Sequence, residues 1–376
     1  MNFSKKAMGI GFPFVNLQNI FGNNVIDVSN LGKAMASDSQ LKDYNLLNGD
    51  VLFVRSSVKL EGVGEAALVP QTLDNTTYSG FIIRFRDEYG LDNNFKRFVF
   101  GIESVRNQIM SQATNSANKN ISQSVLENLE LAIPSKSEQQ KIGAYFSNLD
   151  HLITLHQRKY DKLVMSKKSM LEKMFPKNGQ TKPEIRFSGF IDDWEQRKLG
   201  ELGTITTGNT PSTSIPDYYS DDGIVWVTPT DICENITFES ARKLSDLGQQ
   251  VGRVVPKNTI LVTCIASIGK NTMLGNTGSF NQQINGLTPN ENKYDPYFLL
   301  TESALWSAKM KGSAAAGTMQ IVNRTEFSEL KTWLPSLIEQ QAIGAFFKQL
   351  DHLITLHQRK VSSRLFLNKS TIFREN

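Results

Sequence analysis

The most regular feature of the chain is a stripe of apolar residues, spaced three and four apart, over residues 138–174. Ile142 and Phe146 open this stripe, and such spacing is typical of an amphipathic helix or coiled coil. Ser137 precedes it as a candidate N-cap, and Pro176 would end it. The pattern predicts one long helix over residues 137–175.

The same helix pattern occurs a second time. Residues 138–159 and 339–360 are identical at 18 of 22 positions, and the match extends upstream to Pro134 and Pro335. Weaker similarity links residues 14–20 to residues 226–232. The chain therefore consists of two copies of one unit, each with a variable block followed by a nearly constant helix.

The variable blocks have the pattern of mixed α and β structure. Short apolar runs at 51–54, 81–85, 224–227 and 259–263 are bounded by Gly, Asn, Asp and Pro, which indicates strands. Residues 95–110 and 296–310 have helical patterns. We therefore expect an α+β protein with α/β domains at 1–136 and 191–337, helices at 137–175 and 338–376, and a linker at 176–190.

Composition limits the classes of protein that the chain can belong to. Two cysteines exclude a disulfide framework, and no apolar run is long enough to span a membrane, so we expect a cytoplasmic protein. The net charge of +4 divides unevenly along the chain, as −1 over 1–135, +6 over 136–186, −4 over 187–336 and +3 over 337–376. The helices are the basic element, either as solvated faces or as surfaces for an acidic partner.

Motifs for catalysis and metal binding are absent from the pattern. Cys264 and Asn271 occupy positions where a P-loop needs Gly and Ser or Thr. All four histidines lie in the repeated helices, five residues apart, whereas metal pairs on a helix prefer a spacing of four. We therefore expect no catalytic residues and no metal site in this chain, and a role in recognition or assembly.

Several segments resemble the specificity subunit of type I restriction-modification systems. The entries into the two helices, Pro134-Ser135-x-x-Glu138-Gln139-Gln140 and Pro335-Ser336-x-x-Glu339-Gln340-Gln341, are similar to that family's conserved helices. Residues 187–201, with Trp194-Glu195-Gln196-Arg197-Lys198-Leu199-Gly200, resemble the opening of a target recognition domain. The loop at 267–270, Ser-Ile-Gly-Lys, resembles a loop that recurs inside such domains. The first block has no counterpart of that opening, so we expect its domain to be N-terminally shortened.

The resemblance implies a fold and a set of partners. Two target recognition domains would each read one half of a bipartite double-stranded DNA target. The two helices would pack as an antiparallel coiled coil with pseudo-twofold symmetry, set the half-site spacing and dock two methyltransferase subunits. Restriction or translocase subunits would join them. The chain would need no cofactor, whereas the methyltransferase would use S-adenosylmethionine and the nuclease would use ATP and magnesium.

The resemblance also directs attention to candidate contact residues. Base and phosphate contacts need Arg, Lys, Asn, Gln and Ser on loops, and the candidates are Arg55, Ser56, Ser57, Lys59, Lys119, Asn120, Lys270, Asn271, Gln282, Gln283 and Arg324. The residues expected to pack the helix pair are Ile142, Phe146, Leu149, Leu152, Ile153, His156, Ile343, Phe347, Leu350, Leu353, Ile354 and His357.

Two other interpretations remain open at this point. One is a coiled-coil assembly protein whose variable blocks bind other proteins, which apolar patches on those blocks would favour. The other is a fragment of a single-chain restriction–methylation enzyme. If the chain does bind DNA, the negative charge of both variable blocks predicts weak binding by the isolated subunit.

Overall fold

The computed structural model describes residues 8–177, 179–265, 267–315 and 321–372, with side chains omitted at 313–315 and 363–372. The predicted first domain and last helix therefore extend, at 1–7 and 373–376, outside the described residues. The chain divides into two compact units. The first comprises Met1–Arg158 and Gln358–Asn376, and the second Lys159–His357.

The first unit contains two small sheets whose strands come from the predicted apolar runs. One sheet has the order β2-β1-β6 and the other β5-β3-β7. All four residues of β3 are buried, as expected of a short central strand. The strands are β1 (Met8–Val15), β2 (Gly32–Ala34), β3 (Val51–Val54), β4 (Ser56–Ser57), β5 (Ala66–Leu68), β6 (Thr77–Tyr78), β7 (Ile82–Phe85) and β8 (Lys119–Asn120).

Short helices surround these sheets: α1 (Asp38–Asp43), α2 (Asn93–Val99), α3 (Glu103–Ser111) and α4 (Gln123–Glu127), with the 3-10 turns η2 (Leu17–Asn19) and η3 (Leu60–Gly62). The segment 95–110, expected to be helical, is divided between two helices, α2 and α3. The backbone of Ile102 is extended at φ −69° and ψ 151°, which ends the first helix and begins the second.

The second unit contains a larger set of strands. Its sheets have the orders β13-β11-β16, β10-β17-β14-β15-β12 and β18-β9. The strands are β9 (Glu195–Lys198), β10 (Gly203–Thr207), β11 (Tyr219–Val227), β12 (Ile236–Thr237), β13 (Lys243–Leu244), β14 (Ile260–Thr263), β15 (Asn271–Leu274), β16 (Gly278–Phe280), β17 (Ile284–Pro289) and β18 (Lys331–Leu334). Its shorter helices are α6 (Leu199–Leu202), α7 (Asp246–Val251), α8 (Pro296–Ala315) and α9 (Arg324–Glu329), with η4 (Pro216–Tyr218).

The two units repeat the same strand topology. In β2-β1-β6 the central strand is antiparallel to one neighbour and parallel to the other, and β13-β11-β16 has the same senses in the same order. The antiparallel set β5-β3-β7 is likewise repeated as β15-β14-β17. The weak sequence similarity upstream of the helices therefore marks equivalent strands.

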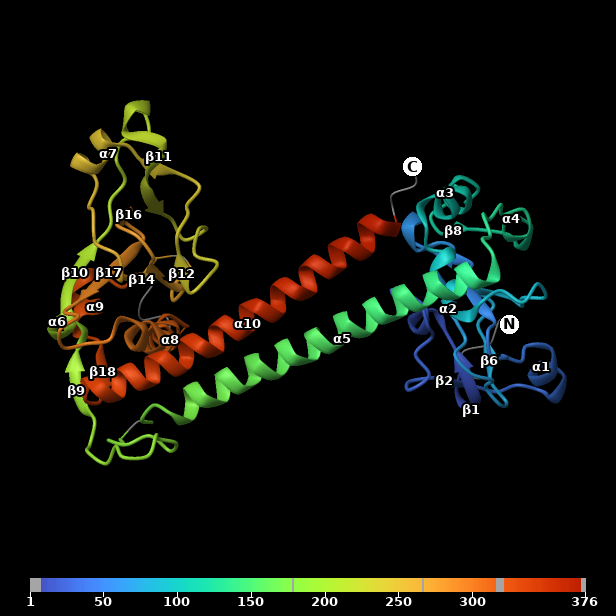
Figure 1. Cartoon of the computed structure of the whole chain (residues 1–376), viewed down its shortest axis with the longest axis horizontal. Helices are drawn as coiled ribbons and strands as arrows, with labels where there is room; N and C mark the ends of the chain where they lie inside the picture. Colours follow the sequence, from blue (N-terminus) through green and yellow to red (C-terminus); the bar gives the residue numbers. More distant parts are fainter. Residues whose placement is uncertain (1–7, 178, 266, 316–320, 373–376) are drawn as a thin grey trace. The chain divides into compact units, whose positions relative to one another are not determined.

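Two long helices, α5 (Lys136–Lys173) and α10 (Leu337–Ile372), follow these blocks (Figure 1). Each begins just after a serine whose hydroxyl accepts a hydrogen bond from a backbone amide in the first turn: Ser135 from Glu138 at 3.3 Å, and Ser336 from Glu339 at 3.4 Å. The prediction of Ser137 as the N-cap is wrong, because Ser137 lies inside the helix and Ser135 caps it instead.

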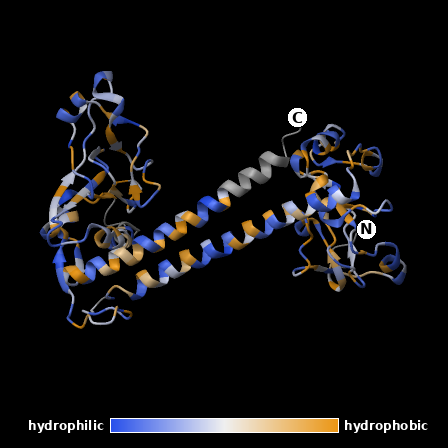
Figure 2. Cartoon of the chain, viewed as in Figure 1, coloured by the Kyte–Doolittle hydropathy of each residue, from blue (hydrophilic) through white to orange (hydrophobic). Residues whose placement is uncertain are grey.

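Along α5 and the part of α10 that is coloured in Figure 2, apolar residues recur between hydrophilic ones. Within the second unit, the end of α5 and the start of α10 run in opposite directions. Lys167 pairs with Asp351 at 2.5 Å, and Phe175 contacts Phe347. The contact partner thus moves from residue 351 back to residue 347 as the chain advances from residue 167 to residue 175. Among the described residues, no helix is long and apolar enough to cross a bilayer.

Candidate nucleic-acid interface

The first group of predicted contact residues lies on a two-stranded ribbon. β4 and β8 are antiparallel, with Ser56 opposite Asn120 and Ser57 opposite Lys119. The amide of Ile121 donates to the carbonyl of the exposed Arg55 at 3.0 Å, which extends the pairing. The structure thus brings together residues that lie more than sixty positions apart in the sequence.

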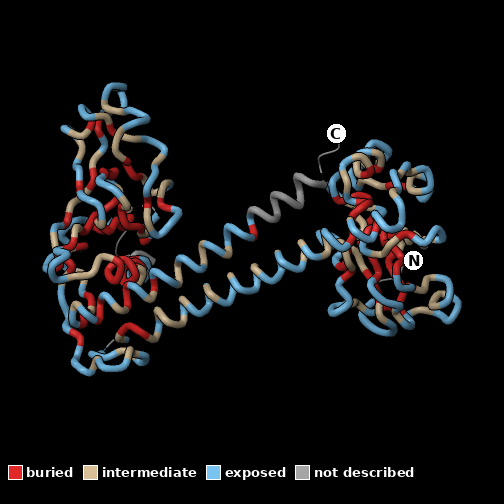
Figure 3. Tube along the Cα trace, viewed as in Figure 1, coloured by how far each residue is buried: buried red, intermediate tan, exposed pale blue. Residues whose placement is uncertain are grey.

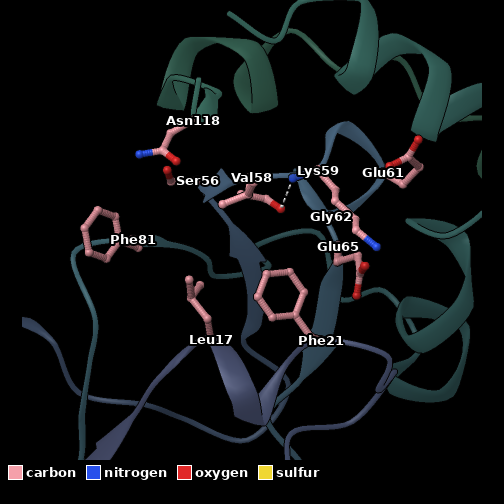
Figure 4. Close-up of a pocket in the computed structure, with 11 residues that line it drawn as sticks. Leu17, Phe21, Ser56, Val58, Lys59, Glu61, Gly62, Glu65, Phe81 and Asn118 are labelled. Atoms are coloured by element: carbon pink, nitrogen blue, oxygen red, sulfur yellow. Dashed lines mark hydrogen bonds between the residues drawn. The ribbon is translucent and has the colours of Figure 1, made fainter. Parts of the chain in front are cut away.

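A cleft of about 520 Å³ opens beside this ribbon (Figure 4). Its wall combines apolar side chains with hydroxyl, amide and charged groups, and its lining includes Leu17, Phe21, Ser56, Lys59, Phe81 and Asn118. Among the described residues, Arg55, Lys59 and Lys119 form no salt bridge, so their charges are available to a ligand. Two acids, Glu61 and Glu65, also line the cleft, and Glu65 accepts a hydrogen bond from the amide of Gly22 at 2.8 Å.

The candidates at 270–271 of the second unit differ from each other in orientation. Lys270 is exposed, and its ammonium donates to the carbonyl of Pro229 at 3.1 Å. Asn271 instead points inward and donates to the hydroxyl of Ser303 on α8. Of the two, Lys270 is the better placed to meet a ligand.

Gln282 and Gln283 lie in the connection between β16 and β17. Gln282 is exposed and accepts a hydrogen bond from the hydroxyl of Thr210. Gln283 is half-buried and accepts from the side-chain amide of Asn281 at 3.1 Å. Thr210 belongs to a polar loop, so two segments of distant sequence form one surface there.

Sequence reasoning missed another cation at this surface. Arg253 is exposed, its guanidinium donates to the carbonyl of Thr207 at 2.5 Å, and its backbone amide donates to Asn209 Oδ1 at 2.8 Å. No motif surrounds Arg253 in the sequence, and only the folded loop places it beside Thr207 and Asn209.

Arg324 is the first residue of α9 and is exposed. The segment before it is tied to the β14 loop, because the amide of Val322 donates to the carbonyl of Cys264 at 3.0 Å. Asn285 donates to both Cys264 Sγ at 3.2 Å and the Val322 carbonyl at 3.1 Å. Burial raises the pKa of the Cys264 thiol to about 11, so this cysteine is an uncharged part of the support.

Both α/β blocks are fixed to their long helices by the same hydrogen bonds, which we call the glutamine clamp. Gln139 donates to the Pro134 carbonyl at 2.9 Å and accepts from the Asp92 amide at 3.0 Å. Gln340 donates to the Pro335 carbonyl at 2.9 Å and accepts from the Asp295 amide at 3.0 Å. Asp92 and Asp295 in turn cap the helices α2 and α8.

One helical turn beyond each clamp lies a glycine that lets the chains approach closely. A Cβ on Gly143 would lie 2.7 Å from Asn94 Cβ and from the Phe95 amide nitrogen. A Cβ on Gly344 would lie 3.0 Å from the amide nitrogen of Phe298. The identical Gln and Gly of the two repeats therefore serve the docking of helix on domain.

The twelve residues predicted to pack the helix pair fall into different environments. Ile142 packs in the first unit's core, and Phe146 lies 5.2 Å from Phe98 of α2, between ring centroids. Ile343 and Phe347 are buried in the second unit's core. Leu152 and Leu353 are exposed, and the remaining six are half-buried: Leu149, Ile153, His156, Leu350, Ile354 and His357. The first turns of both helices therefore contact the α/β blocks, and the burial of side chains falls along the middle of α5 (Figure 3).

Comparison with known proteins identifies the family of the chain. Two segments of the chain, 1–165 and 191–364, match the family model described as type I restriction modification DNA specificity domain. A putative type I restriction enzyme MjaX specificity subunit from Methanocaldococcus jannaschii is 22% identical over 366 residues, 93% of this chain and 83% of that protein. The type I restriction enzyme HindI specificity subunit from Haemophilus influenzae is 28% identical over 171 residues, 43% of this chain and 37% of that one.

Solved structures agree with this fold. The S subunit of a type I restriction-modification system from M. genitalium matches with a TM-score of 0.64 at 14% identity, over all of this chain and 92% of that one. The HsdS subunit from Thermoanaerobacter tengcongensis matches with a TM-score of 0.51 at 16% identity, over 96% of this chain and 89% of that one. The chain therefore belongs to the type I restriction-modification DNA specificity family, and its role is DNA sequence recognition.

Proposed function

We propose that each α/β block reads one half of a bipartite DNA target, with the first domain at 1–136 and the second at 191–337. The observation that carries this proposal is the repeated glutamine clamp. A reader that must place a base contact precisely needs a rigid connection to whatever sets the spacing. Buried hydrogen bonds that are the same in both copies supply such a connection.

In this proposal, α5 and α10 continue along each other as an antiparallel coiled coil with pseudo-twofold symmetry. The pairing of Lys167 with Asp351 and the contact of Phe175 with Phe347 would be its end within the second unit. The half-buried residues in the middle of both helices, such as Leu149 and Leu350, would form its seam. The length of the pair would fix the distance between the half-sites.

The chain would be a non-catalytic subunit in this scheme. Two methyltransferase subunits, using S-adenosylmethionine, would dock on the helices and adjoining domains, and restriction or translocase subunits, using ATP and magnesium, would join for cleavage. The variable blocks are net acidic, so partners would supply much of the phosphate contact. This division of labour predicts weak DNA binding by the isolated chain and tight binding by the assembled complex.

The DNA contacts of the first domain would come from the ribbon and the cleft beside it, through Arg55, Ser56, Ser57, Lys59, Lys119 and Asn120. Those of the second would come from Lys270, Gln282, Gln283, Arg253 and Arg324. Asn271 would support the loop from inside, because its amide is held by Ser303. Hydroxyl, amide and guanidinium groups of this kind read base edges in the major groove.

A domain exchange tests the proposal. The chain is co-expressed with its methyltransferase partner, methylated adenines are mapped across a genome, and residues 191–335 are then replaced by the matching domain of a relative. We expect a split motif of which one half changes and the other half and the spacer length stay. An unchanged motif, with the chimaera assembled, would contradict the proposal.

A further inference from the structure

The connections β6–β7 and β16–β17 occupy the same place in the two domains. The amide of Ser79 donates to the Val15 carbonyl, and the amide of Asn281 donates to the Val227 carbonyl, both at 3.0 Å. Two residues later the carbonyls of Phe81 and Gln283 accept hydrogen bonds at 2.8 Å, from the amides of Arg55 and Cys264. Phe81 and Gln283 are therefore structurally equivalent.

The side chains at this shared position have opposite chemistry. Phe81 is 53% exposed and lines the same cleft as Val58, which is 77% exposed. The second domain has Gln283 there, with the amides of Gln282 and Asn281 around it. One domain thus presents an apolar surface where the other presents hydrogen-bonding amides.

Phe81 and Val58 both line this cleft together with polar side chains, and exposed apolar surface rimmed by polar groups is typical of a ligand-binding groove. The surroundings indicate which ligand that is. Ser56 and Asn118 lie at the same end of the cleft as Phe81, whereas Glu61 lies at the other end (Figure 4). The Phe81 end therefore combines an apolar ring with hydrogen-bonding groups and lies away from the carboxylate.

This combination matches the edge of one base. In the major groove only thymine carries a methyl group, and phenylalanine is among the side chains that contact it, while Ser and Asn reach neighbouring acceptors and donors. Phe81 and Val58 offer no donor to a phosphate, so these two side chains fit an apolar group of the ligand and not an anion.

We propose that Phe81, together with Val58, contacts the C5 methyl group of a thymine in the first half-site, and so determines specificity at that base pair. The inference rests on the proposed DNA-reading role of the first domain and adds the base and the contacting atoms. The equivalent Gln283 would present an amide in the second half-site, so the two half-sites would be read by different chemistry at one shared position.

The experiment removes the methyl group alone. The chain is assembled with its methyltransferase partner, and affinity is measured for a duplex carrying the mapped motif and for duplexes in which deoxyuridine replaces one first-half-site thymine at a time. We expect one replacement to weaken binding about three- to five-fold, the value of one buried methyl group. Phe81→Ala should bind the thymine duplex as weakly as the wild type binds that deoxyuridine duplex, and should lose the thymine–uracil difference.

Two further variants keep the result interpretable. Phe81→Leu retains an apolar contact and should keep part of the difference, and Tyr89→Ala, which removes another exposed aromatic ring of the first unit, should keep all of it. The inference is overturned if no thymine of the first half-site responds to loss of its methyl group, or if Phe81→Ala responds as the wild type does. A complex that methylates no split motif would instead contradict the proposed function itself.

Discussion

The glutamine clamp is the same in the two domains, but the residues around it differ. Gln139 is preceded by Glu138, which is exposed, whereas Gln340 is preceded by Glu339, which is 1% exposed and held by Arg186. About three turns further along each helix, Asp150 pairs with Arg97, while its counterpart Asp351 accepts from the hydroxyl of Tyr297 and pairs with Lys167. The repeat therefore preserves the docking contact and lets each domain surround it differently.

This difference has an energetic consequence. Burial lowers the pKa of Arg97 even though the negative charge of Asp150 opposes the shift, and a bidentate hydrogen bond with Glu339 raises the pKa of Arg186. Identical residues of the two long helices therefore contribute differently to the stability of their units. All four tryptophans lie within the second unit, so tryptophan fluorescence follows that unit alone, and hydrogen exchange can follow the first.

The largest expected effect is that of Phe347, which is compared with its counterpart Phe146. Phe347 is fully buried against Phe175, so Phe347→Ala should destabilise the second unit by about 4 kcal/mol, because it leaves a cavity. Phe146 is half-buried, so Phe146→Ala should cost the first unit about 2 kcal/mol. Urea unfolding followed by tryptophan fluorescence, and hydrogen exchange for the first unit, measure these losses. Equal losses would show that the two copies are packed alike.

A second comparison tests the buried ion pair. Arg186→Ala strands the Glu339 carboxylate in the protein interior and should destabilise the second unit by about 3 to 4 kcal/mol. In the first copy the counterpart of Glu339 is Glu138, whose carboxylate is exposed, so Glu138→Ala should alter stability by less than about 0.5 kcal/mol. A loss below about 1 kcal/mol for Arg186→Ala would mean that Glu339 reaches water.

A third comparison concerns pH. Glu302 of α8 lies seven residues after the capping Asp295, and Val99 of α2 lies seven residues after the capping Asp92, so the two positions correspond. Burial raises the pKa of the Glu302 carboxyl from 4.5 to about 8. The folded state then binds a proton that the unfolded state has released, so stability falls as pH rises from about 4.5 to 8.

We expect the second unit to lose about 3 kcal/mol between pH 5 and pH 8, and Glu302→Gln to flatten this slope. Urea titrations at several pH values, followed by tryptophan fluorescence, measure it. A wild-type slope that survives in Glu302→Gln would assign the titration to another group.

The smallest expected effect is that of breaking the glutamine clamp, and it should be the same in the two units. Gln139→Ala and Gln340→Ala each leave a backbone amide and a carbonyl without their partner, which should cost about 2 kcal/mol in the respective unit. The adjacent Gln140→Ala and Gln341→Ala remove exposed amides and serve as controls. A clamp that matters in only one unit would break the equivalence of the two copies.

The sequence predicted those features whose signal is local or repeated. Runs such as Val51–Val54 became strands because both faces of β3 are buried, and the long helices were visible as periodic apolar stripes. The repeat also contained the signal for the clamp, since Gln139 and Gln340 are identical. Their role in the clamp could not be predicted, because a glutamine within a helical pattern is typical of a surface residue. Its partner, the backbone at the start of another helix, is revealed only by the fold.

What could not be predicted depends on contacts between distant segments. Ser56 and Asn120 were both candidates, but only the pairing of β4 with β8 places them side by side. Phe81 was assigned to a strand and its exposure was hidden, because a short apolar run does not reveal which member faces outward. Asn271 was a candidate that the fold turns inward toward Ser303.

The most direct test of the account is a chain with two second domains. Residues 191–335 replace residues 1–134, so that the splice falls at the shared Pro-Ser before each helix, and the motif methylated by the assembled complex is mapped. If each domain reads one half-site and the helices set the spacing, the motif becomes an inverted repeat of the second half-site with the spacer unchanged. An asymmetric motif that still contains the first half-site would contradict the account.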